Sequence, residues 1–343
     1  MAHEITEVDD VAWTGEKPWH GLGTEVKGLM DTREAMRKAS LDWTVAKVPL
    51  ATAPYVGGLF DKPIPGGLYV PDYYATVRED TNEVLGVVGT QYSVFQNWQM
   101  FDFIDALLQE KCSVVEVCGS LRRGKLVWAL LKLPGHIRVN KTDDISLKYL
   151  LLTNSHDGST SFRVLFTLVR VVCWNTLSAA LERGERQGVH IRHTRNMQDK
   201  VDEARRVLGL ANEQYDRMGH VVDRLAKYRP GTVKVKKFLE DLLPVDERKD
   251  EHWRMIVKKQ RGRVFELFQT GQGQDIRGVK GSAWALVNAV TEHVDWRQNA
   301  PRLKGCDAGE SRLISAWFAS GADLKDRALY LAMRMAGIRP GRN

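Results

Sequence analysis

Two strongly apolar segments separated by one short polar loop constrain this chain more than any other feature. Residues 145–153 (ISLKYLLLT) and 162–174 (FRVLFTLVRVVCW) flank residues 154–159 (NSHDGS). Apolar runs rich in Val and Leu and bounded by turn residues are typical of strands that are buried on both faces. The Asp-Gly pair inside the loop favours a tight turn, because Gly adopts positive φ without a steric clash. We therefore predict a buried β-hairpin at the centre of the fold.

Shorter patterns surround this hairpin. We expect strands at 42–50, 67–79, 84–88, 113–119, 125–133 and 188–194, and helices at 33–40, 95–110 and 175–183. The clearest helix covers residues 198–228, where apolar residues are spaced alternately by three and four: Val201, Ala204, Leu208, Ala211, Tyr215, Met218, Val222 and Leu225. This a/d seam predicts packing on the chain's own sheet, with another subunit as the alternative partner.

Helical patterns dominate the C-terminal third. Charged helices extend to about residue 268. The Gly-rich residues 271–281 are not a phosphate-binding loop, because no GK[ST] ending closes them. We expect them to form a flexible connector, as Gly-rich loops often do. Ser282 is expected to cap a helix through Asp295, and one last helix contains Trp317. This order of elements predicts an α+β fold, an antiparallel sheet with a central β-hairpin packed by long helices and a helical C-terminal part. The expected organisation is an α+β core domain (1–229), a basic helical insert (230–270) and a C-terminal helical part packed on the core (271–343).

The positive charge is concentrated in one segment. The 343 residues include 50 Lys+Arg and 43 Asp+Glu, a net charge of +7, and residues 192–263 hold 19 of the basic and 12 of the acidic residues. A localised basic surplus is typical of a polyanion-binding surface, and a solvated helical face is the alternative. No apolar run approaches the ~20 residues that cross a bilayer, and the acidic N-terminus does not resemble a signal peptide, so we expect a cytoplasmic protein.

The sequence offers little metal or cofactor chemistry. The four cysteines form no CxxC pair, so we expect buried free thiols rather than a disulfide framework or a zinc site. Asn288, Glu292 and Asp295 share one helical face and could bind a divalent ion, but a solvated polar face is the favoured interpretation. No cofactor and no metal are expected.

The polar loop contains the residue types of a catalytic triad, Ser155, His156 and Asp157. A triad needs these side chains to converge, whereas consecutive side chains on an extended chain point to opposite faces. The favoured interpretation is a polar loop tip, with Asn154 and Asp157 bonding the local backbone. Contact with a ligand phosphate or a neighbouring subunit is a second possibility, and an enzyme that uses this loop is a third.

Basic residues supply the strongest functional hypothesis. An Arg in a buried strand is costly unless it is paired or faces a cleft. Basic side chains that line one groove could follow a phosphate backbone, and an exposed Trp–His pair could stack on a base, although a Trp in such a loop more often covers the core. The predicted nucleic-acid-binding residues are Arg122, Arg123, Lys125, Lys148, Arg163, Arg170, Arg192 and Arg195, with Trp19 or His20 for stacking. The alternative for Arg163 and Arg170 is pairing with local carboxylates.

Several motifs resemble the phage- and plasmid-associated family of unknown function DUF932. The matching segments are KPWHGLG (17–23), VLGVVGTQYSVFQN (84–97), NSHDGSTSFRVLFTLVRVVCWNTL (154–177), GVHIRHTRN (188–196) and GSAWALVNAVTEHVDW (281–296). This resemblance implies a mobile genetic element in a bacterial host, and it carries no catalytic residues. The order of the elements is also similar to the core of Rad52-like single-strand annealing proteins, which is an analogy at the level of fold.

These observations favour a non-enzymatic protein of a phage or plasmid that binds single-stranded DNA, or RNA, and assembles into a homo-oligomer, in the manner of an annealing or recombination factor. One alternative is a protein-interaction or anti-defence factor that binds a host protein through the 198–228 seam and the 305–335 helix. The other is an enzyme that uses residues 154–159.

Overall fold

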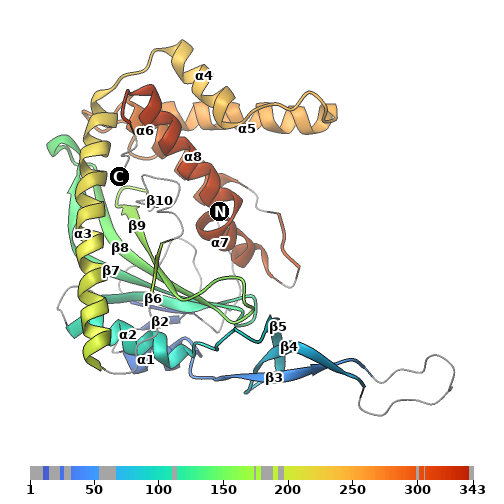
Figure 1. Cartoon of the computed structure of the whole chain (residues 1–343). Helices are drawn as coiled ribbons and strands as arrows, with labels where there is room; N and C mark the ends of the chain where they lie inside the picture. Colours follow the sequence, from blue (N-terminus) through green and yellow to red (C-terminus); the bar gives the residue numbers. More distant parts are fainter. Residues whose placement is uncertain are drawn as a thin grey trace.

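The structure is a computed structural model. It describes residues 11–14, 24–26, 32–53, 67–109, 114–173, 175–178, 188–191, 197–298, 301–304 and 306–339. Helices pack against a large, mostly antiparallel sheet, and a second, smaller sheet lies beside it (Figure 1). The predicted α+β class is therefore confirmed.

The large sheet has the strand order β10-β9-β8-β7-β6-β1-β2, and β11 also pairs with β9. Its strands are β1 (Val11–Thr14), β2 (Thr24–Val26), β6 (Val114–Leu121), β7 (Leu126–Arg138), β8 (Ile145–Ser155), β9 (Arg163–Arg170), β10 (Asn175–Ser178) and β11 (Val189–His190). The predicted central hairpin is β8 and β9, which pair antiparallel from Ser146 opposite Arg170 to Thr153 opposite Arg163. Gly158 has φ +78° in the loop that joins them, as the Asp-Gly turn requires.

The long helix α3 (Met197–Lys227) runs along the large sheet (Figure 1). Six of its eight seam residues are buried, and the other two, Val201 and Leu208, are partly buried and pack against the same core. The Tyr215 hydroxyl accepts the Thr167 N–H at 3.1 Å and donates to the Tyr149 carbonyl, so it joins the helix to both strands of the hairpin. Packing of the seam on the chain's own sheet is confirmed.

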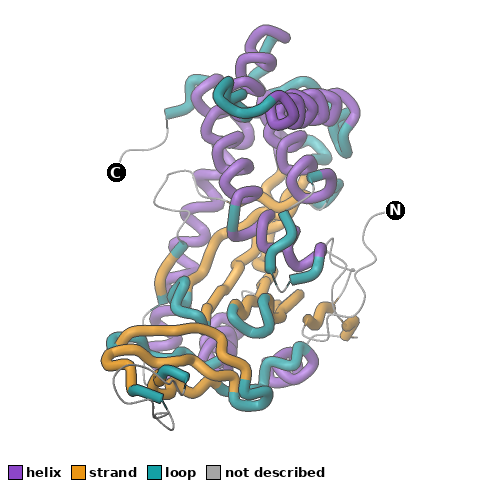
Figure 2. The backbone as a smooth tube through the Cα atoms, turned by 90° about the vertical axis from the view of Figure 1, so that its right-hand side faces the viewer, coloured by secondary structure: helices purple, strands orange, loops and turns teal. Residues whose placement is uncertain are grey.

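The smaller sheet consists of β3 (Val45–Ala51), β4 (Tyr69–Arg78) and β5 (Glu83–Gly89). Two short helices, α1 (Thr32–Lys38) and α2 (Asn97–Gln109), precede and follow this sheet in the chain. Figures 1 and 2 both place the smaller sheet at the opposite end of the molecule from helices α4 and α5. Val48, Val84, Val87 and Tyr73 are exposed on it, with exposed fractions between 37% and 54%.

The C-terminal helices are α4 (Thr232–Leu242), α5 (Glu251–Thr270), α6 (Ala283–Glu292), α7 (Ala308–Phe318) and α8 (Ser320–Met335). Every residue of α6 is buried, and α6 packs against α3, α5, α8 and β10. Ser282 caps α6 as predicted, because its side chain accepts the Ala285 N–H at 3.0 Å. Within the described residues, no helix combines the length and the apolar character that a membrane span requires.

Three of the predicted helices differ in part from the structure. The helix expected at 175–183 begins as strand β10, which pairs with the end of β9. The helix expected to reach Asp295 changes into a π-helical turn at His293–Arg297. The single last helix is divided into α7 and α8 at Ala319, whose φ of −133° and ψ of −144° are not helical. At β10 the pairing with β9 overrode the local helical pattern.

Candidate functional site

The predicted basic strip is divided between the two ends of the central hairpin. Arg122 and Arg123 lie on the exposed turn between β6 and β7, near the β8–β9 loop. Arg122 Nη1 is 3.4 Å from Asp157 Oδ2, and Arg123 Nη1 is 3.2 Å from Glu83 Oε1. Each of these arginines therefore has a carboxylate beside it, which lowers the net positive field of the turn.

The other predicted basic residues are spread over the sheet. Lys125 and Arg163 are partly buried, and partly buried Lys148 has its Nζ 5.6 Å from the centre of the Tyr215 ring. Arg192, Arg195, Trp19 and His20 lie outside the described residues.

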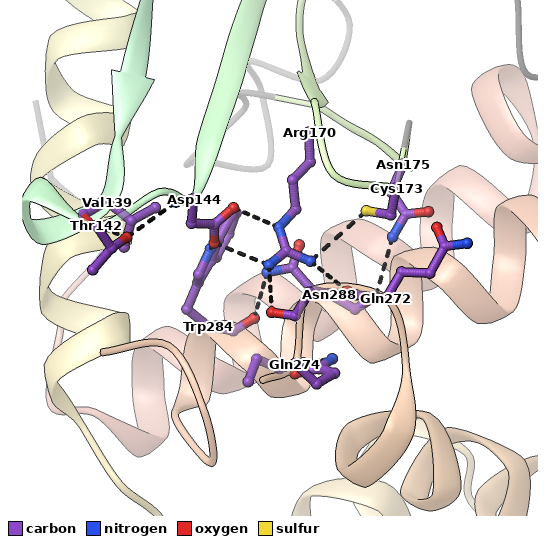
Figure 3. A network of polar contacts seen from close by, with 12 residues as sticks. Val139, Thr142, Asp144, Arg170, Cys173, Asn175, Gln272, Gln274, Trp284 and Asn288 are labelled. Carbon is purple, nitrogen blue, oxygen red and sulfur yellow. Dashed lines mark hydrogen bonds and ion pairs between the residues drawn. The ribbon is translucent and has the colours of Figure 1, made fainter. Parts of the chain in front are cut away.

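The prediction that Arg170 contacts a nucleic acid was wrong. Its side chain is 2% exposed and lies in the closed polar network drawn in Figure 3. Its Nε donates to Asp144 Oδ1 at 2.7 Å and its Nη2 to Asp144 Oδ2 at 3.1 Å, while Trp284 Nε1 donates to the same carboxylate at 2.9 Å. Its Nη1 also donates to the Gln272 carbonyl at 3.0 Å. Pairing with a nearby carboxylate, the alternative considered for Arg170, is what the structure contains, so this guanidinium cannot contact a phosphate backbone.

The Gly-rich segment 271–281 is also different from the prediction. Arg170 Nη1 and Nη2 donate to the carbonyls of Gln272 and Gly273, which fixes the segment against the end of β9. Gly273 has φ +67°, and a Cβ there would lie 2.9 Å from Arg170 Nη2. Part of the segment expected to be a flexible connector is therefore one wall of the buried network.

The loop 154–159 connects the hairpin to α2 rather than forming an exposed tip. His156 is fully buried, and its Nε2 is 2.9 Å from Asn97 Oδ1. Asn97 Nδ2 donates to the Leu41 carbonyl at 3.0 Å, so Oδ1 is the acceptor and His156 Nε2 carries the proton. Burial holds the pKa of His156 at about 4, so the ring is neutral at pH 7.

The three residues of triad type have separate partners. Ser155 Oγ donates to the Thr160 carbonyl at 2.7 Å, and Asp157 Oδ1 accepts the Ser159 N–H at 2.9 Å. Local backbone bonding was expected for Asn154 as well, but its Nδ2 donates to the distant Phe95 carbonyl at 2.9 Å. Since none of these bonds joins one member of the set to another, the loop acts in this structure as a connection between elements.

The polar face of α6 is buried, so the prediction of a solvated face was wrong. Asp295 Oδ1 accepts from Lys325 Nζ at 2.8 Å, and Asp295 Oδ2 accepts the Thr176 N–H at 2.7 Å. Asn288 and Glu292 are 3% and 2% exposed. Among the described residues, no group of three His, Cys, Asp or Glu side chains could hold a metal ion. Cys118, Cys173 and Cys306 are buried free thiols, as expected, and Cys112 lies outside the described residues.

A concave basic site lies outside the set of residues that were predicted to bind nucleic acid. We call it the cationic cleft, and it has a volume of about 460 Å³. It is lined by Ile256, Lys259, Gln260, Arg263, His293, Arg297 and Gln298. The first four recur at the spacing of one helical face on α5, and the rest come from the π-helical turn and the residue after it. π-Helical turns occur often at functional sites.

The cleft has a surplus of positive charge. Lys259 and Arg263 are exposed, and no carboxylate in the described part of the chain pairs with either. Arg297 Nη2 is 3.6 Å from Glu292 Oε1, which is the one ion pair at the rim among the residues that the structure describes. His293 is only 2% exposed, and neither of its ring nitrogens has a hydrogen-bond partner among the described residues. Burial and the nearby Arg263 charge hold the pKa of His293 at about 4.

A signal for this site was present in the sequence. Residues 254–263 (RMIVKKQRGR) contain five basic residues and no acidic one. They lie inside the segment that carries the surplus charge, but the contribution of His293 and Arg297 depends on how α5 packs against α6.

The chain belongs to the family described as a domain of unknown function, DUF932, whose model matches residues 84–317. The matched region contains the central hairpin, the buried polar network and the cationic cleft. No curated protein and no solved structure matches the chain.

Proposed function

We propose that this chain is a single-stranded nucleic-acid-binding protein of a phage or plasmid, which acts in the cytoplasm of the bacterial host and binds the strand through the cationic cleft and the exposed basic face of α5. The observation that carries the proposal is a set of cations on that face, Lys258 and Lys259 followed by Arg263, with which no carboxylate of the described residues forms an ion pair. Cations that release counterions from phosphates supply most of the affinity for a nucleic-acid backbone, whatever its sequence.

Apolar side chains beside these cations favour an unpaired strand. Met255 and Ile256 on α5 are 57% and 41% exposed, and Ile256 lines the cleft. Unpaired bases present apolar faces that can pack on such side chains, whereas a duplex hides the same faces in its stack. This arrangement differs from the predicted strip on the central hairpin, because the cations come from α5 and the π-helical turn.

Self-association is part of the proposal, and the smaller sheet is the surface that supports it. Cross-strand pairing places Val48, Ala75 and Val87 on one face of β3, β4 and β5. Val48 and Val87 are exposed there, and exposed apolar sheet faces are often contact surfaces. Repetition of the α5 face around an oligomer would extend the site for one strand.

For the alternative of a host-protein interface, the seam of α3 offers no surface, because it is buried against the chain's own sheet. Helices α7 and α8, which occupy the predicted 305–335 helix, and the exposed apolar residues of α5 would serve that alternative. An activity screen that includes His156→Ala tests the enzyme alternative.

Fluorescence anisotropy with a labelled 20-nucleotide strand at low salt tests the proposal. We expect the wild-type protein to bind the single strand more tightly than a duplex of the same length. Lys259→Glu combined with Arg263→Glu should reduce the affinity at least about tenfold, since each lost phosphate contact weakens binding. The matched control is Arg33→Glu with Lys38→Glu, which makes the same charge change on exposed α1. The absence of binding by the wild-type protein, or equal losses in both variants, would contradict the proposal.

A further inference from the structure

The cationic cleft is concave and ends on a histidine, which a surface that only follows a backbone does not require. Lys259 and Arg263 come from α5, and His293 and Arg297 come from the π-helical turn, whose Arg297 carbonyl accepts from Arg263 Nη1 at 3.4 Å. A volume of about 460 Å³ is within the range of small-ligand sites. The cleft is therefore large enough to enclose a phosphorylated chain end.

His293 is the second, independent observation. Buried polar groups are nearly always hydrogen-bonded, yet neither ring nitrogen of His293 has a partner in the described part of the chain. The ring lines the cleft and is 2% exposed, so a partner would have to approach it from the cleft. An oxygen-rich ligand in the cleft would provide the missing partner.

The number and sign of the groups indicate the class of ligand. A phosphodiester has one negative charge and two non-bridging oxygens, whereas a phosphate monoester has a charge of about −1.5 to −2 at pH 7 and three strongly accepting oxygens. Three cations, one of them beside Glu292, leave a surplus of two positive charges, which together with an imidazole donor matches the monoester better. Arginine forks also suit phosphate oxygens, because two parallel N–H groups can bind one phosphate.

We propose that the cationic cleft binds a terminal phosphate monoester, the phosphorylated end of a nucleic-acid strand. This inference rests on the proposed function and assigns a specific ligand group to its site. In this arrangement Arg263 and Arg297 hold the phosphate oxygens, and His293 donates one hydrogen bond from the floor. The exposed face of α5 then contacts the diesters that follow.

Competition anisotropy separates this inference from general backbone binding. The strands compared are a 20-mer with a 5′-phosphate, the same 20-mer with a 3′-phosphate, the unphosphorylated 20-mer and an unphosphorylated 22-mer. The 22-mer has two additional diester charges, so it controls for the charge that a terminal phosphate adds. We expect one of the phosphorylated strands to bind about tenfold more tightly than the 22-mer, a preference that one or two charge-assisted hydrogen bonds can supply.

Variants then locate the preference. Arg263→Gln on the exposed rim should reduce it to less than about twofold, because one charge-assisted hydrogen bond accounts for most of a tenfold ratio. His293→Gln should weaken it as well, and Arg263→Gln keeps the test valid if substitution of the buried histidine prevents folding. The control Arg33→Gln should preserve the preference.

Each outcome gives a decision. Equal affinity for phosphorylated strands and the 22-mer would overturn the terminal-phosphate assignment and leave the proposed function intact. No binding of any strand would overturn both. Adenosine monophosphate is added as a further competitor, and its displacement of the strand without an advantage for phosphorylated strands would also overturn the strand-end assignment and indicate a free nucleotide. A phosphate preference that survives Arg263→Gln would place the site elsewhere and overturn the inference.

Discussion

A polar site that contains arginine lies at each end of helix α6, and the two sites differ in how the arginine charge is compensated. At its start, Trp284 and the adjacent loop surround Arg170, whose guanidinium is paired with Asp144 and hydrogen-bonded to two carbonyls (Figure 3). At its end, the π-helical turn presents Arg297 beside Lys259 and Arg263, with Glu292 as the one acidic partner among the described side chains. The comparison indicates that pairing and burial, rather than the presence of arginine, distinguish a structural cation from one that is available to a ligand.

The largest effect should come from breaking the closed site. Arg170→Leu leaves Asp144 buried without its counter-ion, which should lower the free energy of unfolding by about 3–5 kcal/mol. Urea denaturation followed by circular dichroism measures this change in the free energy of unfolding. The matched variant Arg263→Leu, in the open site, should change stability by less than about 0.5 kcal/mol. Equal stability of the two variants would remove the distinction between the sites.

Acid should destabilise the protein through its buried histidines. The pKa of His156 is about 4 in the folded state and about 6.5 when unfolded, so the unfolded chain gains a proton first as the pH falls. The stability is fully present above pH 6.5 and decreases toward pH 4, and His156 alone should account for about 2 kcal/mol between pH 7.5 and 5. Denaturation at both pH values should show a smaller pH effect in His156→Gln, whose amide can still donate to Asn97. An NMR titration in which His156 changes charge near pH 6.5 would refute this prediction.

Substitutions at two glycines with the same φ can distinguish backbone strain from steric crowding in the closed site. Gly273 and Gly281 both have φ +67°, but a Cβ at Gly273 would lie 2.6 Å from Val172 Cγ1 and 2.9 Å from Arg170 Nη2, whereas nothing lies within 4 Å of one at Gly281. Gly281→Ala should cost about 1 kcal/mol from backbone conformation alone. Gly273→Ala should cost about 1–3 kcal/mol more, because a side chain or the loop must move. Thermal unfolding of both variants measures the difference, and equal values would mean that the loop yields freely.

The smallest effect is expected at the predicted turn between β6 and β7. Arg123 is exposed and lies 3.2 Å from Glu83, and such surface pairs contribute about 0–1 kcal/mol. Arg123→Ala should therefore leave stability nearly unchanged and reduce strand affinity less than about threefold in the anisotropy assay. A loss as large as that of the Lys259 and Arg263 variant would return the binding site to the central hairpin.

Features that depend on interactions between residues close together in the sequence could be predicted, whereas features that depend on distant residues could not. The hairpin, the α3 seam and the Ser282 cap depend on local patterns, and the structure contains all three. The burial of Asn288, Glu292 and Asp295 depends on contacts between residues more than 100 positions apart, such as Thr176 with Asp295. No periodic pattern in the sequence encodes that contact. The cationic cleft was visible only in part, because residues 254–263 show their charge but not their position beside His293.

The central claim is that the cations of the cleft are free to contact phosphates. The salt dependence of strand binding tests this claim most directly. The slope of log affinity against log salt concentration should fall in magnitude by about 1.4 when Lys259 and Arg263 are both replaced by Ala, since each phosphate contact on a single strand contributes about 0.7. Arg33→Ala with Lys38→Ala should leave the slope unchanged. Identical slopes for the wild-type protein and the cleft variant would contradict the account.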